Sequence, residues 1–120
     1  MDRQKGRVVQ AREEDHTIAD PGTAQAIPVG KSGQVPLVIL DAVQTNTLAI
    51  PAFRGQELTL YAYSVAGSGT RAVTASARVN VAAQTIMTFD AAGDLVVLKA
   101  IDIGGNLRWE IIANDGVALS

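Results

Sequence analysis

The stretch of the chain that most resembles a chemical motif is VGKSG, residues 29–33, because Gly-Lys-Ser is the end of the phosphate-binding P-loop. The complete motif, G-x-x-x-x-G-K-[S/T], lies between a buried strand and a helix whose N-terminus faces the phosphates. Position 25, where the first glycine belongs, is glutamine. Pro36 and two nearby valines favour extended chain over a helix. The sequence therefore predicts an exposed turn that leads into a strand, with no nucleotide or other cofactor bound.

The titratable residues also form no convincing site. His16 is the only histidine and lies in a charged segment, whereas a general base or a metal ligand needs fixed geometry. Asp90 and Asp94 flank a turn, but two carboxylates are too few oxygen ligands for Ca²⁺, so we expect them to accept hydrogen bonds from turn amides. The chain has no cysteine. These residues predict neither a metal site nor a catalytic site, and hence a protein that is not an enzyme and has no small-molecule substrate.

Three aromatic residues could form a stacking platform for bases or sugars, namely Tyr61, Tyr63 and Trp109. Trp109, however, alternates onto the apolar side of a predicted hairpin. Packing of Trp109 in the core is therefore the favoured interpretation.

Composition excludes several classes of protein. A length of 120 residues indicates one domain, and a net charge of −2 provides no basic field for a nucleic acid. The N-terminus is charged, unlike a signal peptide, and no run of apolar residues is long enough to span a membrane. The chain has only two Phe, two Tyr and one Trp, which predicts a thin core completed by partner subunits, and we expect a homotrimer.

The charged residues are concentrated at the start of the chain. Residues 1–20 carry Asp2, Arg3, Lys5, Arg7, Arg12, Glu13, Glu14, Asp15 and Asp20. With few apolar residues among them, this segment is predicted to be a flexible arm over residues 1–22. The turn sequence Asp20-Pro21-Gly22-Thr23 separates the arm from a body over residues 23–120.

The body is predicted to be all-β. Apolar or alternating runs indicate strands at residues 35–40, 47–50, 57–63, 71–79, 85–89 and 117–119, with a hairpin over residues 95–113. A two-residue loop at Gly104-Gly105 would pair Ile103 with Asn106, Lys99 with Glu110 and Ala100 with Trp109. The fold class predicted is a small β-sandwich or barrel of about seven or eight short antiparallel strands.

The second half of the chain resembles small structural proteins of tailed-bacteriophage virions. The resemblance covers residues 46–120 and rests on T-L-x-x-P-x-x-x-G-Q, then T-I-x-T-F-x-x-A-G-D, then G-G-x-x-x-W-x-x-x-x-N-D-G. A compact β body with a charged arm is most similar to head-decoration, or cement, proteins. The diagnostic residues of the best-known decoration family are absent from the sequence.

The resemblance implies a protein on the outer surface of the phage head that binds the major capsid protein and stabilises the shell. The alternative is a fibre or head-fibre module that binds a receptor or glycan through Tyr61 and Tyr63. For the first function, the arm would be the capsid-docking element. The residues expected to dock are Arg3, Lys5, Arg7, Val8, Val9, Arg12, Glu13, Glu14 and Ile18.

Overall fold

A computed structural model describes residues 16–120, and these residues form ten β-strands and no helix. Of the sequence expectations, the all-β class is confirmed. The strands are β1 (His16–Thr17), β2 (Gln25–Ala26), β3 (Gly33–Ile39), β4 (Val43–Leu48), β5 (Glu57–Val65), β6 (Thr70–Ala75), β7 (Ile86–Phe89), β8 (Leu95–Ile103), β9 (Asn106–Asp115) and β10 (Ala118–Leu119).

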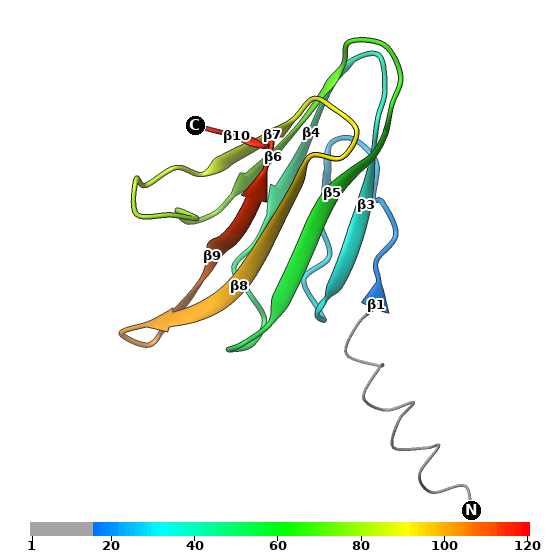
Figure 1. The fold of residues 1–120 in the computed structure, drawn as a ribbon. Helices are drawn as coiled ribbons and strands as arrows, with labels where there is room; N and C mark the ends of the chain where they lie inside the picture. Colours follow the sequence, from blue (N-terminus) through cyan, green and yellow to red (C-terminus); the bar gives the residue numbers. More distant parts are fainter. Residues whose placement is uncertain (1–15) are drawn as a thin grey trace, which may run out of the picture.

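The strands form two five-stranded sheets that pack face to face as a small β-sandwich (Figure 1). Sheet A has the order β1-β3-β5-β8-β9, and sheet B has the order β10-β7-β6-β4-β2. The end strands of sheet A differ greatly in length, since β1 has two residues and β9 has ten, whereas both end strands of sheet B, β2 and β10, have two.

The first six strands alternate between the two sheets, with β1, β3 and β5 in sheet A and β2, β4 and β6 in sheet B. Each connection between them therefore crosses from one sheet to the other. Successive strands of one sheet then run in the same direction, and β1–β3, β3–β5, β2–β4 and β4–β6 all pair in parallel. The prediction of an antiparallel body is wrong for these pairs, and it holds for β5–β8, β6–β7, β7–β10 and β8–β9.

The β8–β9 hairpin has the predicted register. Ile103 pairs with Asn106, Lys99 with Glu110 and Ala100 with Trp109. Gly104 and Gly105 have φ angles of 62° and 90°, as a tight hairpin turn with two left-handed residues requires. The carboxylate of Asp102 accepts a hydrogen bond from the Gly105 amide at 2.8 Å.

The core lies between the two sheets. Nineteen apolar residues of the described range are buried, including Phe89, Met87 and Trp109. The Trp109 indole nitrogen donates to the Ala49 carbonyl at 2.9 Å, so the polar part of the ring is satisfied inside the core. Trp109 is thus a core residue, as predicted. Eight large apolar side chains of this range are exposed, and the expected homotrimer stays a prediction.

Residues 16–22 belong to the body, which corrects the predicted boundary at residue 22. His16 and Thr17 pair with Gly33 and Gln34 of β3. Ile18 is 6% exposed and lies in the core cluster. Ile18 is therefore not a free anchor for a capsid, because its side chain is already packed against this chain. The other predicted docking residues, from Arg3 to Glu14, lie outside the described residues.

Candidate functional site

The turn that resembles a P-loop has a structural explanation. β3 begins directly at Gly33, so the motif is followed by a strand instead of a helix. The Ser32 hydroxyl accepts a hydrogen bond from the Glu57 amide at 3.1 Å, which holds the turn against β5. A Cβ at Gly33 would overlap the His16 carbonyl oxygen, so glycine allows β1 to approach β3 closely. Gly33 thus serves strand packing.

The acidic turn at residues 90–94 is also structural. One carboxylate oxygen of Asp94 accepts hydrogen bonds from the amides of Asp90, at 3.0 Å, and Ala91, at 3.1 Å. Asp94 is 7% exposed. The prediction that a carboxylate here satisfies turn amides is confirmed for Asp94.

The most distinctive polar cluster is centred on Arg71, which is fully buried at the inner face of β6. Its Nε donates to the Asn46 side chain at 2.6 Å, and its two terminal nitrogens donate to the two carboxylate oxygens of Asp20 at 2.9 and 2.5 Å. A further bond reaches the Val38 carbonyl at 2.9 Å. Arg71 in sheet B is therefore connected both to the segment after β1 and to β3 in sheet A.

The Asp20 carboxylate also accepts hydrogen bonds from the amides of Gly22 and Val38, at 2.8 and 2.9 Å. Burial alone would raise the pKa of Asp20. The hydrogen bonds from Arg71 and from these two amides, together with the charge of the guanidinium, outweigh burial and lower the pKa from 3.8 to about 2. Asp20 is therefore ionised at neutral pH, and we call Asp20, Arg71 and Asn46 the Arg71 clamp.

The sequence contained an indication of the clamp. Arg71 has the same strand parity as Val73 and Ala75, which predicts an inward side chain. Asn46 likewise shares parity with the buried Leu48. What the sequence could not reveal is the partner, since Asp20 is 51 residues from Arg71 and belongs to a turn.

A second candidate site is the outer surface of sheet B. Burial alternates along β4 and β6, so every second side chain points away from the core. Neighbouring strands place these outward residues in rows, as their register shows. The rows are Val43 and Thr70, then Thr45, Ala72, Thr88 and Ala118, then Ala26, Thr47, Thr74 and Ile86.

We call these ten residues the threonine face, and within the described part of the chain no member is charged. Charged residues make up 18% of the whole chain, so a solvated face of this size would normally carry some. Depletion of charged residues is typical of the centre of a protein contact. Arg71 lies between two members of the face in sequence but points into the core, and the next charges, Asp41 and Asp90, lie beyond the strand ends.

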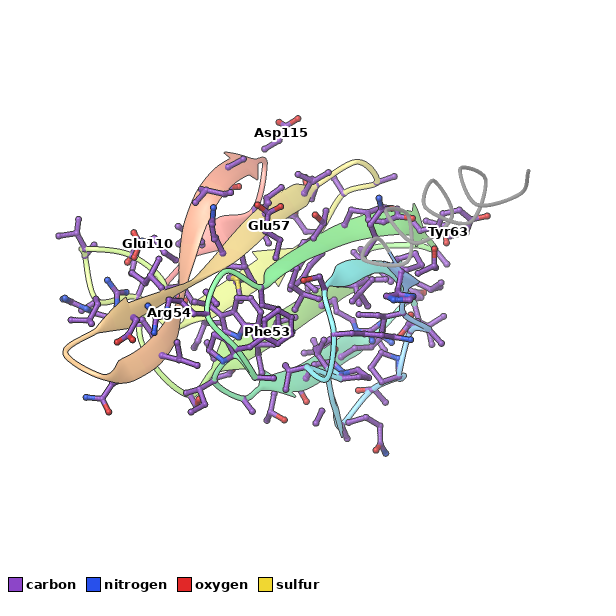
Figure 2. The ribbon with its side chains drawn as sticks, turned by 90° about the horizontal axis from the view of Figure 1, so that it is seen from below. Phe53, Arg54, Glu57, Tyr63, Glu110 and Asp115 are labelled. Carbon is purple, nitrogen blue, oxygen red and sulfur yellow. The ribbon has the colours of Figure 1, made fainter. Side chains whose placement is uncertain are left out.

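A third group of exposed residues lies at the ends of β5. The loop before β5 presents Phe53, which is 46% exposed, beside Arg54, and Tyr63 lies apart from them towards the other end of the strand (Figure 2). Tyr61 and Tyr63 share the outer side of sheet A, and Tyr63 is 67% exposed. Tyr61 is half-buried beside its strand partners Pro36 and Leu95.

Neither a family model nor a curated protein sequence matches the chain. In residues 16–120, no group of three or more His, Asp or Glu side chains is placed to hold a metal ion. Over the same range, no helix is long and apolar enough to cross a membrane.

Proposed function

We propose that this chain is a structural protein of a tailed-bacteriophage head, which binds the major capsid protein on the outer surface and stabilises the shell. The resemblance of residues 46–120 to phage virion proteins supports this function. So does a compact sandwich that follows eight charged residues within positions 1–15.

The Arg71 clamp is the observation that carries the proposal. It joins Asp20, three residues after β1, to β6 of sheet B and β3 of sheet A, which anchors the segment that follows the arm in the sandwich. A docking arm can hold the body on a shell only if the arm is firmly joined to the folded body. The charges of the arm, Arg3, Lys5 and Arg7 followed by Glu13 and Glu14, suit a capsid surface with complementary charge.

Ordering 15 residues costs on the order of 1–2 kcal/mol for each residue, so a single arm binds weakly. Two or more arms on one oligomer raise the local concentration of one another and supply the missing affinity. Two copies already provide two arms, and the homotrimer expected from sequence would provide three.

Deletion of residues 1–15 tests the proposal. Particles of the phage that encodes the chain, stripped of this protein, are mixed with the wild-type chain or the truncated chain and sedimented. We expect the wild type to sediment with the particles and the truncated chain to remain in solution while keeping its β-sheet circular dichroism spectrum. Equal occupancy of the two proteins would show that the arm is not the anchor, and failure of the wild type to bind would refute the function.

A charge-reversed arm provides the matched control. Arg3→Glu with Arg7→Glu keeps the length of the arm but changes its charge, and we expect binding to weaken. Val8→Ala with Val9→Ala keeps the charge and removes the apolar contacts. The two variants separate electrostatic from apolar docking.

The exposure of Tyr63 supports a second candidate, a fibre or head-fibre module that binds a receptor or glycan. Two tyrosines on one side of a sheet form a surface on which a sugar ring can stack. Tyr63→Ala would then abolish binding to host cells or purified surface glycans and leave capsid occupancy unchanged. Capsid decoration predicts no effect of Tyr63→Ala on either measurement, so the binding to host cells or glycans distinguishes the two functions.

A further inference from the structure

We infer that the threonine face is the surface on which a second copy of this chain packs, as a twofold dimer. The dimer does not depend on the phage function, because its evidence lies in the shape and charge of sheet B alone.

The first observation is the lack of charge. A contact with a different protein is normally specified by complementary charges, and the threonine face offers none among its described residues. The N-terminal segment is also a poor occupant, since eight of its 15 residues are charged and would lose water without gaining partners. The same uncharged face of a second copy needs no complementary charges and buries no charged residue, so two copies can pack through this face.

The second observation is a projection and a hollow on the same face. Val43 is 77% exposed at the start of β4. A hollow of about 360 Å³ lies around the other end of the same strand, where Thr47 and Ala49 of the β4 end meet Thr74 and Ser76 of the β6 end. Val43 and Thr47 are four residues apart, which is about 13 Å along a strand.

These two features are self-complementary under one symmetry operation. A twofold axis that lies in the contact plane and crosses β4 at right angles keeps β4 over β4 of the second copy and exchanges its two ends. Val43 of each copy then faces the hollow of the other, and Thr45, midway between Val43 and Thr47, lies at the axis. Because the projection and the hollow lie on the same face, the contact uses the same patch of both copies. It is therefore complete with two copies and leaves no free site for a third.

The size of the face sets the expected strength. The strands of sheet B contain twenty residues, and at about 3.3 Å per residue and about 4.8 Å between strands they give about 320 Å² on each copy and about 640 Å² for the pair. That area is below the roughly 1,000 Å² of a stable specific interface and fits a weak, transient contact. We therefore expect a dissociation constant in the micromolar range and a dimer that separates on dilution.

Charge substitution at the axis is the sharpest test. Thr45→Glu and Thr45→Lys each place two like charges opposite one another in a homodimer, so light scattering should report monomers for each variant alone. Mixed in equal amounts, the two variants should regain the mass of a dimer, because Glu then faces Lys. The same substitutions at Gln34, an exposed residue of sheet A, form the control and should leave the wild-type mass unchanged.

Cross-linking gives an independent measurement on a folded protein. The chain has no cysteine, so Thr45→Cys and Gln34→Cys each introduce a single thiol. Packed sheets are about 10 Å apart, too far for a disulfide, and a short bis-maleimide is used instead. We expect covalent dimers from Thr45→Cys at tens of micromolar protein and none above background from Gln34→Cys.

Three results would overturn the inference. They are a wild-type mass of a monomer at several hundred micromolar, a wild-type mass of a trimer, or equal cross-linking at Thr45 and Gln34. Capsid binding is a separate readout, so a dimer that fails to bind particles would refute the proposed function and leave the dimer intact.

Discussion

Asp20 and Arg71 join two segments that are 51 residues apart. Their contribution to the free energy of unfolding is measured by substituting one partner at a time. Asp20→Ala leaves the buried guanidinium without its carboxylate, which typically costs about 3–5 kcal/mol. We expect the free energy of unfolding to fall by about 3 kcal/mol in urea titrations, since the Asp20 side chain is 21% exposed and water offsets part of the loss.

The double variant Asp20→Ala with Arg71→Met is the control for that measurement. Removing both charges leaves no unpaired ion in the core, so the double variant should be more stable than Asp20→Ala alone. If the loss of stability in the double variant equalled the loss in Asp20→Ala plus the loss in Arg71→Met, the pair would not interact energetically.

Acid should weaken the same contact. The pKa of Asp20 is lower in the folded protein, at about 2, than its usual value of 3.8. The stabilisation is therefore complete above about pH 5 and is lost as the pH falls from about 4 to 2, and the difference amounts to about 2 kcal/mol. Urea titrations of the wild type and Asp20→Asn at pH 6, 3 and 2 check this. Their difference in stability should shrink towards pH 2, and a constant difference would contradict the assignment to Asp20.

Among the elements, the β8–β9 hairpin was predictable from sequence because its connection is local. Two glycines fix the turn, and the turn then fixes every pair as far as the bulge between Val97 and Leu98. β4 and β6 were located less well, as β4 covers residues 43–48 instead of 47–50 and β6 ends at Ala75 instead of Val79. The cause in β4 is that Gln44 and Asn46 point inward, so apolar periodicity does not mark the strand.

Parallel pairing could not be predicted because the relevant connections look like hairpin turns. The three residues between β3 and β4 would suit a hairpin as well as a crossing from sheet A to sheet B. Parallel strands are usually recognised as continuous apolar runs buried on both sides. Here each sheet has one exposed side, so β4 and β6 alternate as antiparallel strands do.

The hairpin turn supplies a test at this scale. Gly105 has a φ of 90°, so Gly105→Ala forces an L-residue into a conformation that it rarely adopts, and we expect a loss of about 1 kcal/mol in thermal or urea unfolding. Gly104→Asn should be nearly neutral, because Asn tolerates the left-handed region at this turn position. Gly30→Ala, at an open position without a positive φ, is the matched control and should leave stability unchanged.

For the whole molecule, the start of the folded body determines how the chain can be shortened. A chain that begins at residue 16 keeps β1, Ile18 and Asp20, whereas one that begins at residue 23 loses a core side chain and the partner of Arg71. We expect the first to retain the wild-type unfolding midpoint and the second to unfold several degrees lower or to aggregate. Equal midpoints would place the fold boundary after Gly22.

The alternation of strands between the sheets also sets the order in which the protein can fold. Partners such as β3 and β5 are separated in the chain by a strand of the opposite sheet, so no parallel pair forms without a long loop being closed first. The β8–β9 hairpin needs a loop of only two residues and can form in microseconds. We expect the C-terminal hairpin to nucleate folding and the N-terminal six strands to assemble late and together. Refolding should then take milliseconds to seconds, and fluorescence of the single tryptophan, Trp109, should report its final burial against Ala49.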